Sequence, residues 1–197
     1  MSGLGSRTLD AADRRAALLD AAERVFCRLG HARTTMSELA AEAGVTRPTI
    51  YAYFPSKDDV FDALADRVRQ EFLSLQERAD TSSPRDIARS TLTAYLDAYT
   101  RHSGMLTIIA HQALVDPRMH RLRADIHSRA NRRHTRFIER LVERGLAAPP
   151  VAPALVAETV TGIVMRFAED AAARPDRHAE LADALVAIYL RLIDLAP

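Results

Sequence analysis

One stretch, from Thr34 to Lys57, constrains the fold more than any other part of this chain. It opens with Thr35-x-x-Glu38, a capping box in which hydroxyl and carboxylate each satisfy a free N–H at a helix start. Gly44 supplies a residue that can turn left-handed, where the short first helix must end. Thr46 can then cap a second helix. Two short helices joined at Gly44 predict a helix-turn-helix.

The second helix has two different faces when it is projected at about 100° per residue. Ile50 and Phe54 fall together, and we expect them in the core. The opposite arc suits a DNA major groove, where Arg pairs with guanine and Thr, Ala or Pro touches thymine methyls. The residues expected to face bases are Arg47, Pro48, Thr49, Tyr51 and Ala52. The residues expected on phosphates are Thr35, Thr46, Tyr53 and Lys57, the last being the only lysine in the chain.

The same residues carry a family resemblance. The run from Ala43 to Lys57 reads Ala-Gly-Val-Thr-Arg-Pro-Thr-Ile-Tyr-Ala-Tyr-Phe-Pro-Ser-Lys and is similar to the signature of tetracycline-repressor (TetR) family regulators. The likeness is strong from about Asp13 to Asp66 and rests on length and an all-helical pattern beyond that. A generic three-helix bundle is the alternative, but it gives no packing reason for the Tyr-x-Tyr-Phe-Pro-Ser-Lys tail. The resemblance implies a homodimer on a palindromic operator and a small-molecule effector.

Composition sets broad limits on the class of protein. The apolar fraction of 48% is ample for a core, and the net charge of +1 means that DNA binding must come from local placement. A single cysteine, Cys27, excludes an internal disulfide and fits a reducing cytoplasm. Residues 1–12 lack the apolar core of a signal peptide, and no apolar run approaches the roughly 20 residues that span a bilayer. We therefore expect a cytoplasmic location and no membrane partner.

Proline and glycine divide the chain into helices. The first is expected from Asp10 or Asp13 to Leu29. The fourth is expected to start at Pro55-Ser56-Lys57 with an apolar stripe through Leu75 and a boundary after it at Ser82-Ser83-Pro84, and it belongs mechanically to both parts of the chain. Later helices are expected at about 84–102, 105–114, 117–145, 153–173 and 177–195. No convincing period-2 segment appears. We predict an all-α protein of about nine helices, with a helix-turn-helix DNA-binding domain at residues 1–55 and an effector-binding and dimerisation domain at residues 56–197.

The last two helices are apolar on more than one side, although an outer helix of a monomer needs only one apolar stripe. The excess predicts a dimer interface across a two-fold axis. The alternative is that both helices are buried inside one domain. The interface residues expected are Val156, Val160, Ile163, Leu181, Leu185, Ile188 and Leu192.

The seventh helix, within residues 118–144, is rich in arginine. A solvated charged face is the default interpretation, and an anion-receptive wall for a carboxylate, phosphate or acyl-carrier ligand is the sharper one. His120, His127 and His134 follow one another at intervals of seven residues, about 10.5 Å apart along a helix, which is too far for one metal ion. We expect solvated histidines, no metal and no cofactor.

A small-molecule cavity is expected among the fifth to eighth helices, because TetR-like proteins usually bind an effector there. Aromatic and methionine side chains with a few polar groups are typical of such pockets, although the same residues at helical spacing are as often simple core. The residues expected to line it are Tyr95, Tyr99, Met105, Ile108, His111, Gln112, Met165, Phe167 and Glu169.

These observations predict a homodimeric transcriptional regulator, most simply a repressor, that binds a palindromic operator and is released by a largely apolar effector. No catalytic signature is present in the sequence, so we expect no enzyme activity. The alternative is a helical small-molecule-binding or enzymatic protein with a vestigial DNA module. An architectural DNA-binding protein without an effector is a third possibility, and a well-packed domain without a cavity would favour it.

Overall fold

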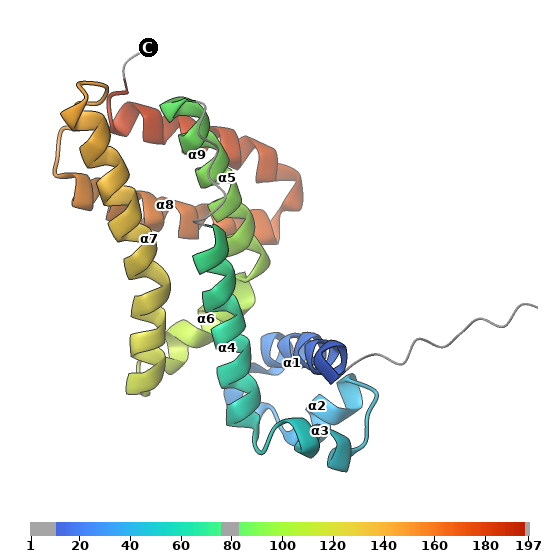
Figure 1. Cartoon of the computed structure of the whole chain (residues 1–197). Helices are drawn as coiled ribbons and strands as arrows, with labels where there is room; N and C mark the ends of the chain where they lie inside the picture. Colours follow the sequence, from blue (N-terminus) through green and yellow to red (C-terminus); the bar gives the residue numbers. More distant parts are fainter. Residues whose placement is uncertain (1–10, 76–82, 196–197) are drawn as a thin grey trace, which may run out of the picture. The chain divides into compact units, whose positions relative to one another are not determined.

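The computed structural model describes residues 11–75 and 83–195, and within these ranges the fold is entirely helical (Figure 1). The first four helices are α1 (Ala11–Arg33), α2 (Met36–Glu42), α3 (Arg47–Tyr53) and α4 (Lys57–Ser74). The later helices are α5 (Pro84–Arg101), α6 (Ser103–Gln112), α7 (Pro117–Glu143), α8 (Pro153–Ala173) and α9 (His178–Leu192). A 3-10 turn, Pro175–Arg177, precedes α9. The all-helical prediction is confirmed, and the one β-type pairing in these ranges is an isolated bridge between Ala147 and Leu195.

The chain divides into two compact units that meet between Asp66 and Arg67, inside α4. This boundary lies later than the predicted one at residue 56, because the first half of α4 packs into the N-terminal unit. Phe61 of α4 lies edge-on against Phe26 of α1, with ring centroids 5.2 Å apart. Ile50 and Phe54 of α3 are buried in the same core, as the helical projection predicted. The guanidinium of Arg15 lies 4.9 Å from the centre of the Phe54 ring.

Local sequence rules set most helix starts in the C-terminal unit. Pro84, Pro117 and Pro153 each occupy a first helical turn, where their missing N–H costs nothing. Ser83 caps α5 through the Asp86 N–H at 3.1 Å, and the Asp116 carboxylate accepts from the Arg118 N–H at 2.7 Å.

In the N-terminal unit, α1 is kinked at Gly30, whose φ of 74° marks the predicted helix end, and it continues beyond the kink to Arg33.

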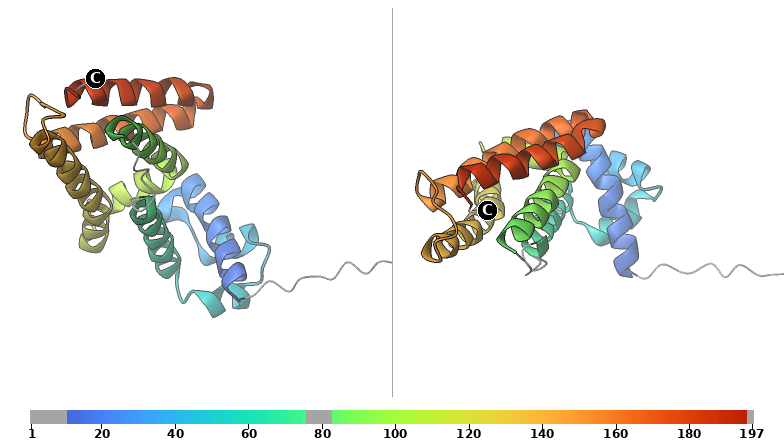
Figure 2. Two further views of the ribbon diagram at one scale, coloured as in Figure 1. Left: turned by 45° about the horizontal axis from the view of Figure 1, so that its top comes forward. Right: turned by 90° about the horizontal axis from the view of Figure 1, so that it is seen from above.

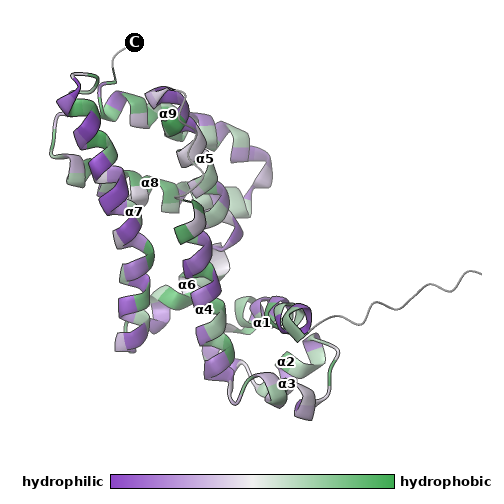
Figure 3. Ribbon diagram, viewed as in Figure 1, coloured by the Kyte–Doolittle hydropathy of each residue, from purple (hydrophilic) through white to green (hydrophobic). Residues whose placement is uncertain are grey.

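The helices α5 to α9 and the second half of α4 build the C-terminal unit. The most extensive packing in this unit joins α8 to α5 and to α7, while α9 covers α5 and α8. Both views of Figure 2 show α8 and α9 running side by side. Hydrophilic residues follow much of α7 in Figure 3, whereas α8 and α9 are mostly apolar. None of the helices in residues 11–75 and 83–195 combines the length and apolar character needed to cross a bilayer.

Part of the predicted dimer interface is wrong, because four of its residues belong to the core of one chain. Val156, Val160, Leu181 and Leu185 are buried against the packed helices of their own unit. The double-sided apolar character of α8 and α9 therefore has an internal cause, since α8 is packed by α5, α7 and α9 together. Ile163 and Leu192 are half-buried, and Ile188 is exposed.

Leu185 provides a test of this assignment. Its side chain is fully buried, so we expect Leu185→Ala to lower the free energy of unfolding by about 2–5 kcal/mol. The matched control is Leu114→Ala, since Leu114 is 80% exposed and should change stability by no more than about 0.5 kcal/mol. Urea denaturation at one protein concentration measures both variants, and equal small effects would contradict the core assignment of Leu185.

Candidate nucleic-acid interface and ligand cavity

The start of α2 is fixed by the predicted capping box. The Glu38 N–H donates to the Thr35 hydroxyl at 3.3 Å, and the Thr35 N–H donates to the Glu38 carboxylate at 2.8 Å. Each bond satisfies an amide that has no partner inside the helix, so the box fixes the residue at which α2 begins.

The turn between α2 and α3 is a Schellman motif. Gly44 has a φ of 66°, its N–H donates to Ala41 O at 3.1 Å, and the Val45 N–H donates to Ala40 O at 3.0 Å. A residue with a Cβ would be strained at this φ, although the space around the atom is open. The prediction that Gly44 ends the first helix is therefore confirmed.

Thr46 takes the N-cap position of α3, but its side chain does not cap the helix. Its hydroxyl lies 2.8 Å from the hydroxyl of Thr49 instead. This detail corrects the predicted capping bond. Pro48 in the first turn lacks an N–H and reduces the number of amides that need a cap.

The outward arc of α3 is open to solvent. The five residues predicted to face bases, Arg47, Pro48, Thr49, Tyr51 and Ala52, are all exposed. The Tyr51 side chain is the largest apolar group among them, at 51% exposure. The Arg47 guanidinium contacts the Ser37 hydroxyl of α2, so this residue also links the two helices. The structure thus gathers on one surface the group types that read a major groove.

The residues predicted to contact phosphate lie at the edges of this surface. Thr35 and Thr46 are exposed, whereas Tyr53 and Lys57 are half-buried. Lys57 already has partners, because its ammonium donates to His31 O at 3.0 Å and to Ala32 O at 3.4 Å. These carbonyls lie just beyond the kink of α1, so Lys57 satisfies groups at a helix end, and an ammonium has a third donor to offer.

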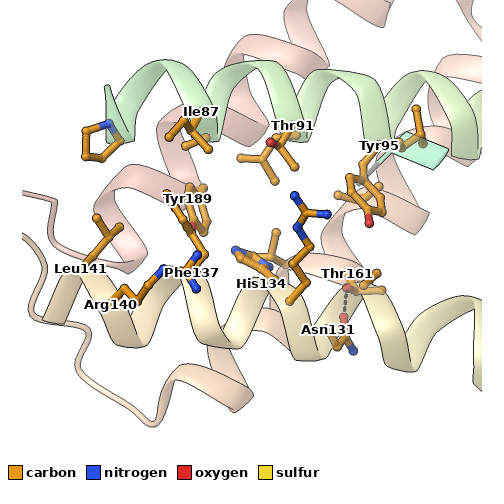
Figure 4. Close-up of a pocket in the computed structure, with 18 of the residues that line it drawn as sticks. Ile87, Thr91, Tyr95, Asn131, His134, Phe137, Arg140, Leu141, Thr161 and Tyr189 are labelled. Atoms are coloured by element: carbon orange, nitrogen blue, oxygen red, sulfur yellow. Dashed lines mark hydrogen bonds between the residues drawn. The ribbon is translucent and has the colours of Figure 1, made fainter. Parts of the chain in front are cut away.

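The C-terminal unit contains a cavity of about 500 Å³ among α5, α7, α8 and α9 (Figure 4). Its size lies in the range of small-molecule sites. Figure 4 shows α5 and α7 as opposite walls, with Ile87, Thr91 and Tyr95 on one and Asn131, His134 and Phe137 on the other. The remaining lining residues are Leu75, Ser83, Pro84, Ala88, Leu92, Tyr99, Ala130, Arg133, Arg140, Leu141, Arg144, Val160, Thr161, Val164 and Tyr189.

Only two of the nine predicted pocket residues, Tyr95 and Tyr99, line this cavity. Met105 is fully buried in the core, and His111 is exposed. The other misplaced residues, which also lie outside the cavity lining, are Ile108, Gln112, Met165, Phe167 and Glu169. Four of these predictions were wrong because α6 contributes no residue to the cavity lining. The three predictions on α8 were wrong because α8 lines the cavity with Val160, Thr161 and Val164 instead. The missed wall was signalled by the apolar residues Phe137 and Leu141, which interrupt the arginines of α7.

Several polar groups face the cavity. The Tyr189 hydroxyl is buried and has no hydrogen-bond partner among the described residues. Its ring lies 5.1 Å from that of His134. Burial lowers the pKa of His134 to about 4, so this imidazole is neutral near pH 7. The Thr161 hydroxyl donates to Asn131 Oδ1 at 2.6 Å, which leaves the Asn131 amide group as a donor.

The histidines of α7 differ from the prediction of a solvated row. His120 is exposed, but His127 and His134 are half-buried. His127 Nδ1 lies 2.8 Å from the Tyr99 hydroxyl, and burial lowers the pKa of His127. The seven-residue interval puts the three histidines on nearly the same face of α7. On that face His127 stacks on Tyr99 of α5 and His134 lies beside Tyr189 of α9.

The second half of α4 packs against Tyr99, one of the residues that line the cavity. Phe72 of α4 lies edge-on against Tyr99, with ring centroids 4.7 Å apart. One residue earlier, a Glu71 carboxylate oxygen lies 2.7 Å from His102 Nε2, and the same carboxylate contacts Arg101. Tyr99 and α4 are therefore in direct packing contact.

Comparison with known proteins places this geometry in context. The family model "Bacterial regulatory proteins, tetR family" matches residues 18–64. The HTH-type transcriptional repressor BepR of Brucella suis is 35% identical over 130 residues, which are 59% of this chain and 62% of BepR. The HTH-type transcriptional regulator TtgR of Pseudomonas putida is 37% identical over 100 residues, 47% of this chain and 48% of TtgR. The match thus spans less than two thirds of these curated relatives.

Solved structures extend the likeness beyond the matched segment. A TetR-like transcriptional regulator from Rhodococcus sp. RHA1 superposes with a TM-score of 0.74 at 25% identity, covering 93% of this chain and 97% of that one. GusR of Salmonella enterica gives a TM-score of 0.74 at 16% identity over 95% of this chain and 98% of its own, and this likeness concerns the fold alone.

The buried imidazole of His134 predicts a pH dependence of stability. An unfolded histidine has a pKa of about 6.5, so the unfolded chain binds this proton first as the pH falls. The free energy of unfolding therefore decreases as the pH is lowered from about 6.5 towards 4. The decrease between pH 7 and pH 5 is about 2 kcal/mol. We expect His134→Gln to remove this contribution, while His120→Gln, at an exposed position of the same helix, keeps it. Denaturant unfolding at both pH values measures the difference; identical pH dependence in the two variants would contradict it.

Proposed function

This chain belongs to the TetR family of bacterial regulatory proteins, and from that premise we propose that it is a DNA-binding transcriptional repressor. In this proposal it binds a palindromic operator as a homodimer and is released by a small-molecule effector. The observation that carries the proposal is the exposed arc of α3, held against α2 by the Schellman turn. Two such helices in one dimer would read half-sites in successive major grooves.

The effector part of the proposal is supported by the cavity of the C-terminal unit. A protein that acted only by bending or coating DNA would need no internal space of about 500 Å³. The cavity reaches Tyr99, which packs on Phe72 of α4, and α4 also contributes Phe61 to the core of the N-terminal unit. A ligand that prefers one position of α4 would shift the population of DNA-competent protein, and DNA would weaken ligand binding by the same factor.

The dimer part of the proposal keeps α8, α9 and the predicted Ile188, but it replaces the four predicted residues that are buried. Leu155 of α8 is 51% exposed and Ile188 of α9 is 41% exposed. Thr159 and Gly162 are also exposed, and a Cβ at Gly162 would meet no atom within 4 Å, so a partner helix can approach closely there. We therefore propose the outward faces of α8 and α9 as the two-fold interface.

The first test concerns how DNA is read. We expect Tyr51→Ala to weaken the operator selectively, by about 1–3 kcal/mol in each half-site, because its side chain faces base edges. We expect Thr49→Ala to act in the same direction. Lys57→Ala should weaken specific and non-specific DNA alike and lower the salt slope by about one unit for each phosphate that is no longer neutralised.

The operator is first recovered from a genomic fragment library, and affinities for it and for a scrambled duplex are then measured at several salt concentrations. Lys57→Arg keeps the charge and is the matched control, and circular dichroism checks the fold, since Lys57 also binds the carbonyls of His31 and Ala32. If Tyr51→Ala and Lys57→Ala gave the same salt slope and the same selectivity, this orientation of α3 would have to be abandoned. Failure to recover any specific duplex would count against the repressor function as a whole.

The second test concerns the dimer. We expect Ile188→Glu combined with Leu155→Glu to give a folded monomer, because a shared apolar interface cannot hold the added charges without a large desolvation cost. Leu114→Glu is the control, since it places the same charge on an exposed leucine outside α8 and α9. Sedimentation equilibrium distinguishes the species. A double variant that remains as dimeric as the Leu114→Glu protein would exclude this interface.

A further inference from the structure

The cavity has an unusual charge balance. Three arginines, Arg133, Arg140 and Arg144, line it, and no acidic side chain is among the described residues of its wall. Their guanidinium groups form no hydrogen bond or ion pair with the described part of the chain. Guanidinium groups that remain unpaired beside an apolar space are suited to a negatively charged ligand. The same groups would repel a cation.

The three arginines are too far apart along the chain for all of them to contact the same group of a ligand. Arg133 and Arg144 are eleven residues apart on α7, a rise of about 16 Å, whereas Arg140 and Arg144 are one turn apart on the same face. Ser83 and Pro84, at the start of α5, also line the cavity, and a helix start adds partial positive charge. Figure 4 shows Arg140 and Leu141 at one end of the α7 wall and Asn131 at the other.

Between these ends the lining is largely apolar, and Arg133 is the charged side chain among its described residues. Ile87 and Leu92 of α5 face Phe137 of α7, with Val160 and Val164 contributed by α8. The Tyr189 side chain also lines this region, and its hydroxyl is enclosed within the wall with no hydrogen-bond partner among the described residues. A buried hydroxyl left unpaired is costly. His134 beside it is neutral and adds no charge.

We propose that the cavity binds an elongated anionic amphiphile. Its carboxylate or phosphate head lies between Arg140 and Arg144, and its apolar body runs between α5 and α7 towards Tyr95. This inference rests on the proposed function, since it identifies the cavity as the effector site, and it adds the chemical class of the effector. The two kinds of head share their charge and their hydrogen-bond acceptors, so the arginine pair accommodates either.

A series of ten-carbon probes tests the class of ligand on the full-length protein. Decanoate and decyl phosphate carry the two anionic heads, decan-1-ol is neutral, and decylammonium is cationic. We expect calorimetry to give at least one of the anions about tenfold tighter binding than decan-1-ol, with decylammonium the weakest. The better of the two anions identifies the head group. Binding of decan-1-ol or decylammonium as tight as that of both anions, or binding of no probe at all, would overturn the proposal.

Variants test the position of the head. Arg140→Ala combined with Arg144→Ala should weaken the better anion about tenfold and leave decan-1-ol unchanged, because only the head is deprived of its partners. Arg129→Ala with Arg132→Ala removes the same charge from the same helix outside this cavity and should leave both affinities unchanged. Equal losses of affinity in the two double variants, or a loss of affinity confined to Arg133→Ala, would contradict the assigned position.

The operator assay separates this inference from the proposed function. Selective anion binding that leaves operator affinity unchanged would support the ligand class and refute the effector role. Release of the operator by a neutral or cationic compound, without binding of either anion, would refute the ligand class and leave the repressor function intact.

Discussion

One helix, α4, is committed to two separate cores. Its first half buries Phe61 against Phe26, and its second half buries Phe72 against Tyr99. Neither pair of rings can be separated cheaply, because truncating a buried aromatic side chain costs about 3–5 kcal/mol. A rearrangement at Tyr99 is therefore more easily accommodated by a shift of α4 than by separating either pair. In the proposed function, this packing would carry a ligand-induced change at Tyr99 to α4 without a dedicated signalling residue.

The parts of the fold that follow from local chemistry were predictable. The capping box of Thr35 and Glu38, the left-handed Gly44 and the prolines that begin α5, α7 and α8 each act through neighbouring backbone groups. Their partners are a few residues away in sequence, so no tertiary information was needed. Thr46 shows the limit of such rules. Its hydroxyl could accept from a backbone amide at the start of α3, but it lies beside the Thr49 hydroxyl instead.

The cavity was less predictable, because its walls depend on which faces of four helices meet. Tyr95 and Tyr99 were identified, whereas Met105 fills the core and Val160 faces the cavity instead of a partner subunit. An apolar residue on a helix carries no sign of whether its neighbour is core, cavity or another chain. The arginines of α7 illustrate the same ambiguity, since one charged helix serves both solvent and the cavity wall.

The way α3 is secured has a consequence for how its activity can be controlled. A helix of seven residues would not persist alone in water, yet here the Gly44 turn fixes one end and the buried Phe54 fixes the other. If α3 reads DNA as proposed, its surface is ordered before DNA binds, and little conformational entropy remains to be lost on binding. An effector would then act by changing the position of the folded α3 helix and not by unfolding it.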